Sequence, residues 1–256
     1  MLDPDMKYKA IMVDIDGTLV AYNYNSLPTK RVQDAVRKAS AHVTVCVTTG
    51  RSYPSTEPIV QSLNLHNGLA IVNNGAQVLD LGEKKVLYEK VLEPNDEEVI
   101  VQYLKSHNIN FHINSLTKDP KGHKEYYPKG LTKIFTEEIF TEEEADRVIA
   151  DLSHIPTITL TKGMHRDPHL FSIAIGHAEA TKQHGIQQVA AILGVSTHEI
   201  IGIGDGYNDF PLLMACGLKV AMGNAVPDLK AIADYVAPSV DEDGVADVIE
   251  KYILNN

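Results

Sequence analysis

The chain lacks several features that mark common classes of protein. Its 256 residues contain no tryptophan and only two cysteines, Cys46 and Cys216, and aromatic residues make up 6% of the total. Both cysteines lie in apolar runs, and neither belongs to a CxxC pair or to a Cys/His cluster with zinc-like spacing. We therefore predict two buried core cysteines, in a composition that fits a reducing cytoplasm.

Long apolar runs and an excess of positive charge are also missing. No stretch approaches the roughly 20 apolar residues that a membrane-spanning helix needs, and the first ten residues lack the apolar run of a signal peptide. The chain has 23 lysines and arginines against 34 acidic residues, for a net charge of -11. Such an acidic surface disfavours nucleic acid and anionic membranes as partners. We expect a cytoplasmic protein that binds neither, while its oligomeric state is left open.

Short apolar runs alternate with helical patterns in both terminal parts of the chain. This alternation is typical of βαβ units, so we predict an α/β fold with a Rossmann-like, doubly wound parallel sheet. The predicted helices include 29–40, 55–63 and 182–193, and the predicted strands include 10–15, 42–49 and 198–205. The middle mixes strand-like and helical runs differently, which predicts an α+β insert. The predicted domains are a core of 1–81 and 177–256 and an insert of 82–176.

The string Asp14-Ile15-Asp16-Gly17-Thr18-Leu19 follows the first apolar run. Its two carboxylates sit at positions i and i+2 and so begin on one face of a strand. Unpaired buried carboxylates are costly, so they need a cation or a shared proton. An isolated DxD is more often a polar strand end, but the six-residue string is far more specific.

Two weaker signals follow along the chain. Thr49-Gly50-Arg51 ends the second predicted strand and offers a hydroxyl and a backbone N–H to a phosphate oxygen. Lys182 stands near the start of a predicted helix. Taken alone, the first is an ordinary turn and the second an ordinary solvated lysine.

The segment Gly204-Asp205-Gly206-Tyr207-Asn208-Asp209 follows another buried strand. It places two carboxylates four residues apart, and an acid cluster with oxygen ligands only suits Mg²⁺. A glycine turn capped by Asn or Asp would look similar. Because ligands of open parallel sheets bind at the carboxyl ends of strands, all these motifs are predicted to face one pocket.

Taken in order, the four motifs resemble the signature of the haloacid dehalogenase superfamily of phosphohydrolases. The resemblance covers nearly the whole chain. The stretch 82–176 is similar to a type IIB cap, and Asn74-Gly75-Ala76 resembles the turn that precedes such a cap. Within the superfamily, the chain looks like the Cof-type sugar-phosphate phosphatases.

The resemblance implies a Mg²⁺-dependent phosphatase that acts on a small phosphorylated metabolite. Asp14 would be the nucleophile that forms an aspartyl-phosphate, and Asp16 the acid and base. The implied metal ligands are Asp14, the backbone carbonyl of Asp16, Asp205, and Asp209 through water or a second shell. The implied phosphate contacts are Thr49, Gly50, Lys182 and Asn208, and Lys182 also offsets the carboxylate charge.

Other functions stay open at this point. A phosphomutase on the same core should carry a more basic cap, whereas the cationic cap residues here are balanced by many acids. A non-catalytic sugar-phosphate and Mg²⁺ binder should have lost Asp14 or Asp16, and both are present. The substrate is unassigned: His123, Lys124, His165 and Arg166 either reach the pocket or are ordinary loop residues. The cationic cap residues weighed here are Lys118, Lys121, Lys124, Lys129, Lys133, Lys162 and Arg166.

Overall fold

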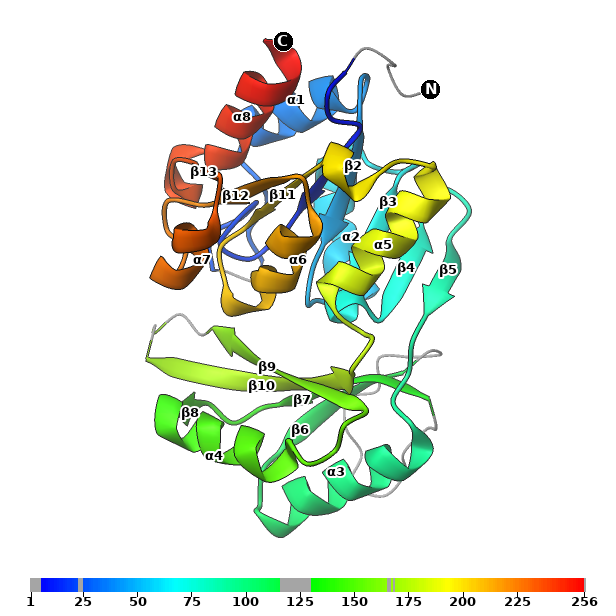
Figure 1. Ribbon diagram of the computed structural model, residues 1–256, viewed down its shortest axis with the longest axis vertical. Helices are drawn as coiled ribbons and strands as arrows, with labels where there is room; N and C mark the ends of the chain where they lie inside the picture. Colours follow the sequence, from blue (N-terminus) through cyan, green and yellow to red (C-terminus); the bar gives the residue numbers. More distant parts are fainter. Residues whose placement is uncertain (1–5, 23–24, 116–129, 165–166, 168, 256) are drawn as a thin grey trace. The chain divides into compact units, whose positions relative to one another are not determined.

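The structure is a computed structural model that describes residues 6–22, 25–115, 130–164, 167 and 169–255. The chain forms two compact units (Figure 1): the first comprises Met1–Tyr88 and Lys182–Asn256, and the second Glu89–Thr181. The sequence placed the corresponding boundaries at 82 and 176. No helix among the described residues combines the length and the apolar character that crossing a membrane requires.

The first unit is built on an eight-stranded sheet in the order β13-β12-β11-β1-β2-β3-β4-β5. The strands from β13 to β3 pair in parallel, and β4 returns antiparallel to β3. The central strands are apolar and buried along their whole length, as expected for a sheet covered on both faces. The strands are β1 Ala10–Val13, β2 Thr44–Thr48, β3 Leu69–Val72, β4 Gln77–Asp80, β5 Lys85–Glu89, β11 Ile200–Gly204, β12 Leu218–Ala221 and β13 Tyr235–Val236.

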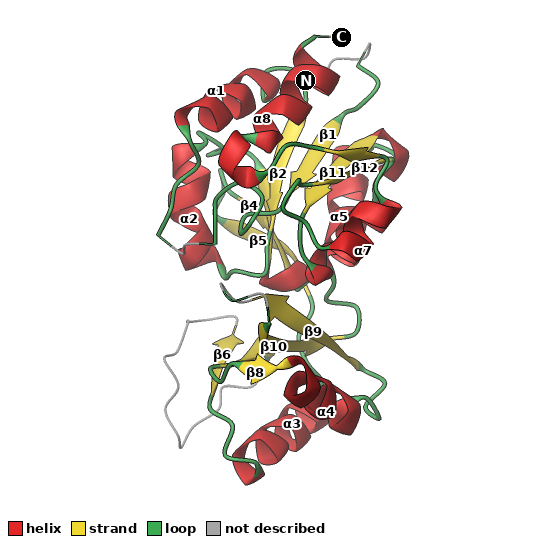
Figure 2. Cartoon of the chain, turned by 90° about the vertical axis from the view of Figure 1, so that its left-hand side faces the viewer, coloured by secondary structure: helices red, strands yellow, loops and turns green. Residues whose placement is uncertain are grey.

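Helices lie on both faces of this sheet (Figure 2). Helices α1 and α8 pack together, while α5 packs on α6 and on β3 and β4. Helix α1 begins after Thr29, whose hydroxyl accepts the backbone N–H of Val32 at 3.3 Å. The predicted doubly wound α/β core is therefore confirmed. The helices are α1 Lys30–Ala39, α2 Tyr53–Ser62, α5 Lys182–Leu193, α6 Phe210–Ala215, α7 Pro227–Ile232 and α8 Gly244–Ile249, which continues as a π-helix over Glu250–Leu254.

Strand β5 differs from the prediction, which placed its residues in the insert. It is the edge strand beside β4 in the first sheet. The turn between the two strands is stabilised by Asp80, whose carboxylate accepts the backbone N–H groups of Gly82 and Glu83, each at 2.9 Å. Short-range hydrogen bonds of this kind return the chain to the core sheet before it leaves for the second unit.

The described part of the second unit is an antiparallel sheet with helices α3 and α4 on one face (Figure 1). Its strands run in the order β6-β7-β10-β8, and β9 also pairs with β10. Helices α3 and α4 and the sheet share one apolar core that includes Ile100, Val148 and Ile173. The elements are α3 Pro94–Ser106, β6 Phe111–Ser115, β7 Leu131–Thr136, β8 Phe140–Thr141, α4 Glu142–Leu152, β9 Ile158–Met164 and β10 Leu170–His177.

Strand β7 was missed by the sequence analysis. Two of its core positions are threonines, Thr132 and Thr136, and both are fully buried. The hydroxyl of Thr136 accepts the backbone N–H of Ile173 at 2.9 Å. Buried threonines with hydrogen-bond partners interrupt the apolar alternation by which a strand is recognised.

Candidate active site

Three neighbouring strands bring the sequence motifs to one edge of the first sheet. Asp14 follows β1, Asp205 follows β11, and Thr49 follows β2. Strand β1 lies between β11 and β2 in the sheet, and all three are parallel. The carboxyl ends of the strands therefore meet at the edge where open α/β sheets bind their ligands.

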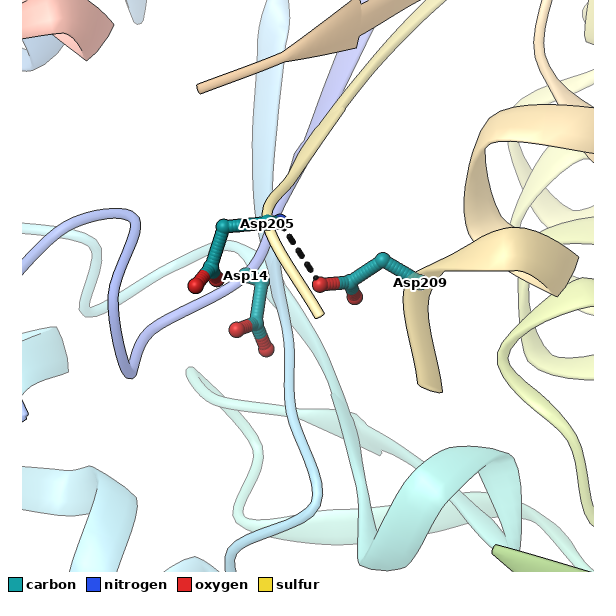
Figure 3. Close-up of side chains that lie close together, drawn as sticks. All are labelled: Asp14, Asp205 and Asp209. Carbon is teal, nitrogen blue, oxygen red and sulfur yellow. Dashed lines mark hydrogen bonds between the residues drawn. The ribbon is translucent and has the colours of Figure 1, made fainter. Parts of the chain in front are cut away.

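Three carboxylates gather at this edge: Asp14, Asp205 and Asp209 (Figure 3). One oxygen from each lies within 4.8 Å of the other two. Their exposed fractions are 4%, 1% and 0%. Among the described residues, this is the one group of acids, histidines or cysteines arranged to hold a metal ion.

Asp209 is oriented by the loop that carries it. One carboxylate oxygen, Oδ2, accepts the backbone N–H groups of Asp205 and Gly206, each at 2.9 Å. These two bonds draw the first turn after Gly206 back onto the end of β11. The other oxygen is left to face Lys182 and the neighbouring acids.

Lys182 lies at the centre of the acid cluster. Its ammonium Nζ donates to Oδ1 of Asp14 and to Oδ1 of Asp209, both at 2.6 Å. The side chain is 1% exposed, so it is not the solvated helix lysine that its position alone suggests. Burial by itself would lower the pKa of Lys182, but Asp14 and Asp209 together raise it above its usual value. The two carboxylates therefore favour the charged form of Lys182 in this site.

The acid cluster holds more negative charge than Lys182 can neutralise. Burial, and after it the charge of Asp209, raises the pKa of Asp14 well above its usual value. The same two causes raise the pKa of Asp205 to about 7. A cation placed among these oxygens would stabilise the charged forms of Asp14 and Asp205. A set of oxygen ligands alone is what Mg²⁺ prefers. The residues present therefore fit a divalent metal ion.

Asp205 is surrounded by donors that the sequence analysis did not identify as such. Its Oδ1 accepts the hydroxyl of Thr18 at 2.9 Å, and its Oδ2 accepts the phenol of Tyr22. Asn224 Nδ2 lies 3.5 Å from the same Oδ2 and donates to the carbonyl of Gly17 at 2.7 Å. The position of Asn224 just after β12, at the same sheet edge, was the one local signal for this contact.

The carboxylate of Asp16 stands apart from the cluster. It receives two hydrogen bonds from Arg51, from Nε to Oδ2 at 2.8 Å and from Nη2 to Oδ1 at 2.5 Å. The Asp16 side chain is 34% exposed, whereas that of Arg51 is 5% exposed. The sequence analysis quoted Arg51 within its motif but assigned it no role.

The predicted phosphate contacts Thr49, Gly50 and Asn208 follow β2 and β11, whose carboxyl ends lie at the same edge of the sheet as Asp14. Thr49 is buried, and its Oγ1 accepts the backbone N–H of Arg51 at 3.1 Å, which shapes the turn. A Cβ on Gly50 would stand 2.8 Å from Oδ1 of Asn74, so a larger residue there would displace the Asn74 side chain. Asn208 is half-buried, and its side chain makes no hydrogen bond to the rest of the described chain. Their predicted contacts with a phosphate remain predictions.

Most of the cap residues considered from the sequence lie outside the described residues. Of the two that are described, Lys162 pairs with Asp146 at 2.7 Å and with Glu142 at 3.4 Å. Lys133 lies over the ring of Phe135 at 5.7 Å. The others are Lys118, Lys121, His123, Lys124, Lys129, His165 and Arg166.

Comparison with known proteins identifies the family. The family described as haloacid dehalogenase-like hydrolase matches residues 11–249. The chain belongs to this family. Among its relatives, 5-amino-6-(5-phospho-D-ribitylamino)uracil phosphatase YcsE of Bacillus subtilis is 28% identical over 255 residues, which span 98% of each chain. Stress response protein YhaX of the same organism is 29% identical over 277 residues, spanning 96% of this chain and 94% of the relative.

A solved structure supports the same family and its subclass. The structure of the haloacid dehalogenase subclass IIB sugar phosphatase BT4131 matches this chain with a TM-score of 0.78. The two sequences are 25% identical, and the match covers 95% of this chain and 98% of the other. The resemblance predicted from the four motifs is therefore confirmed. As a haloacid dehalogenase-like hydrolase, the chain is an enzyme with an α/β core and an inserted α+β domain.

Proposed function

We propose that this hydrolase is a Mg²⁺-dependent phosphatase of small phosphorylated metabolites that works through an aspartyl-phosphate on Asp14. The observation that carries the proposal is the buried trio of Asp14, Asp205 and Asp209 around the ammonium of Lys182. Phosphoryl transfer needs positioning and charge neutralisation above all, and this arrangement supplies both. An intact Asp16 adds the acid and base that a phosphatase needs.

Asp14, Asp205 and Asp209 would hold Mg²⁺, together with the backbone carbonyl of Asp16. When bound, the ion neutralises charge on the phosphate and keeps the Asp14 carboxylate ionised. Lys182 and Asp14 share a hydrogen bond of 2.6 Å, which fixes the nucleophile and lets the same ammonium face the phosphate oxygens. Thr49, the backbone N–H of Gly50 and the amide of Asn208 are the remaining phosphate donors.

The reaction has two halves. In the first, a carboxylate oxygen of Asp14 attacks phosphorus, the bond from phosphorus to the ester oxygen breaks, and Asp16 gives its proton to the leaving alcohol. In the second, water attacks phosphorus of the aspartyl-phosphate, Asp16 takes a proton from that water, and the bond from phosphorus to the Asp14 oxygen breaks. Inorganic phosphate leaves and the Asp14 carboxylate is restored. General acid–base catalysis of this kind contributes about 10²–10⁴-fold to a rate.

The substrate class follows from chemistry and from the relatives' names. The proposed metal ion, Lys182 and the other phosphate donors would contact the phosphoryl group alone, so the organic part must be selected elsewhere, and the inserted second unit is the proposed cap. One relative is named for a phosphorylated ribitylaminouracil, and a structural neighbour is a sugar phosphatase. A phosphorylated polyol or sugar is therefore the class to test first.

The test is phosphate release from a panel of sugar, polyol, pyridoxal and ribitylaminouracil phosphates, with Mg²⁺ and with EDTA. We expect release that requires Mg²⁺, that is abolished in Asp14→Asn, and that persists in Asp34→Asn. Asp34 is the matched control because its carboxylate pairs with Lys30 and Arg37 on helix α1. Substantial activity in Asp14→Asn would refute the nucleophile, and turnover only in the presence of a bisphosphate would indicate a phosphomutase.

A further inference from the structure

Arg51 and Asp16 form a two-point contact beside the proposed active site. The guanidinium donates from Nε to one oxygen of Asp16 at 2.8 Å and from Nη2 to the other at 2.5 Å. Two parallel bonds between a planar guanidinium and a carboxylate fix the orientation of the carboxylate as well as its place. A single lysine ammonium could not fix both.

Arg51 is itself held in place from several sides. Its Nη1 donates to the carbonyl of Ser55 at 3.3 Å, and its backbone N–H donates to the hydroxyl of Thr49 at 3.1 Å. Its backbone carbonyl accepts the N–H of Asn73 at 2.9 Å. The buried guanidinium is therefore a rigid support, and Asp16 is the partly exposed partner that it carries.

The position of Asp16 suits a group that protonates the leaving oxygen. The buried oxygens of Asp14, Asp205 and Asp209 form one group, to which the Asp16 carboxylate does not belong. In phosphoryl transfer the attacking and leaving oxygens lie roughly in line, on opposite sides of phosphorus. A group that protonates the leaving oxygen must therefore stand outside the group that surrounds the nucleophile, as the 34%-exposed Asp16 does.

We propose that Arg51 is the positioning residue of Asp16, which it holds where the acid and base must act. This inference rests on the proposed phosphatase function. Each carboxylate oxygen has two lone-pair sites, so an oxygen bonded to Arg51 keeps one site for the proton that passes to the leaving alcohol. Arg51 itself touches neither substrate nor metal in this assignment.

A purely structural ion pair would have a different signature from a positioning residue. Loss of a structural pair lowers the amount of folded enzyme and reduces turnover of every ester by the same factor. Loss of a positioning residue disables both proton transfers of Asp16. Of these, only protonation of the leaving group belongs to the first half-reaction, which kcat/KM reports because the alcohol leaves in that half. An alkyl phosphate depends on that protonation, because an alkoxide is a poor leaving group, whereas para-nitrophenolate leaves as a stable anion.

The experiment compares kcat/KM for glycerol phosphate and para-nitrophenyl phosphate in the 256-residue chain with Mg²⁺, because kcat also contains the second half-reaction, which is the same for both esters. For Arg51→Met we expect kcat/KM on glycerol phosphate to fall about 100-fold, the low end of a general acid's contribution, and kcat/KM on para-nitrophenyl phosphate to fall less than about tenfold. Asp16→Asn should show the same selective loss. The double variant should be no slower on glycerol phosphate than Asp16→Asn alone, since both changes remove one function.

Two further variants complete the design. Arg51→Lys keeps the positive charge but loses the two parallel hydrogen bonds to Asp16. It should therefore show the same selective loss on glycerol phosphate, in a folded protein, even where Arg51→Met is unstable. Arg37→Met removes an exposed arginine that pairs with Asp34 at 2.7 Å and should leave both rates unchanged.

The outcomes separate the two proposals. An equal loss of kcat/KM on both esters in both Arg51 variants, or no loss at all, overturns the positioning role of Arg51. The phosphatase mechanism is then still tested separately by Asp16→Asn. If the unchanged enzyme hydrolyses neither ester nor any member of the wider panel, the proposed function fails and the role of Arg51 fails with it.

Discussion

Lys182→Met is the variant that most directly tests the charge balance of the site. Methionine has nearly the length of lysine and removes only the ammonium, which bonds Asp14 and Asp209 at 2.6 Å each. Both carboxylates then remain buried without their cation. Breaking a buried pair by removing one partner typically costs about 3–5 kcal/mol, because an uncompensated charge is left behind.

We therefore expect the metal-free variant to lose about 3–5 kcal/mol of unfolding free energy at pH 8 in chemical denaturation. The loss should shrink as the pH falls, since protonation of the Asp14 carboxyl removes the uncompensated charge. Turnover with Mg²⁺ should fall about 10²–10³-fold, the usual loss when one electrostatic stabiliser of a transition state is removed.

Lys30→Met is the matched control. Lys30 pairs with Asp34 at 3.0 Å on the exposed face of α1, with 73% of its side chain exposed. Exposed pairs four residues apart on a helix contribute only about 0.3–0.5 kcal/mol. If Lys182→Met were no less stable than this control and equally active, the view of Lys182 as the central cation of the site would be refuted.

Three further predictions concern the surroundings of Asp205. The pKa of Asp205 is raised to about 7 in the folded protein and is about 3.9 in an unfolded chain. Between these two pH values the folded state binds more protons than the unfolded state. The unfolding free energy of the metal-free protein should therefore fall as pH rises from about 4 to 7. The Mg²⁺-induced rise in Tm should then be larger at pH 8 than at pH 5, and equal rises would contradict the charge argument. Gly17→Ala places a Cβ in steric conflict with Oδ2 of Asp205 at a φ of +80°. Chemical denaturation should therefore show a far larger loss of unfolding free energy than in Gly194→Ala, where φ is +67° and nothing lies within 4 Å. Tyr22→Phe removes a donor to Asp205 and should weaken Mg²⁺ binding in calorimetry by about tenfold or more; Tyr103→Phe, which loses a bond to Asp151 in the second unit, should bind Mg²⁺ normally.

The local elements of the fold were largely predictable. Helix α5 spans Lys182–Leu193, the range predicted from the sequence, and β3 and β4 flank the turn that contains the predicted Asn74-Gly75-Ala76. Burial of one face is a repeating local property, so it leaves a readable period in the sequence. The grouping of the acids at strand ends was predictable for a second reason. Parallel strands carry their carboxyl ends to one edge of the sheet.

The partners of the acids were decided by tertiary structure. Tyr22 and Asp205 are 183 residues apart in the chain, and Arg51 and Asp16 are 35 apart. No local period encodes which side chains meet across such separations. The strand order that places β11 beside β1 and β1 beside β2 brings them together. Sequence alone therefore predicted which residues form the candidate site, while the packing of the sheet decided how each is held, because hydrogen bonds between distant residues exist only in the folded chain.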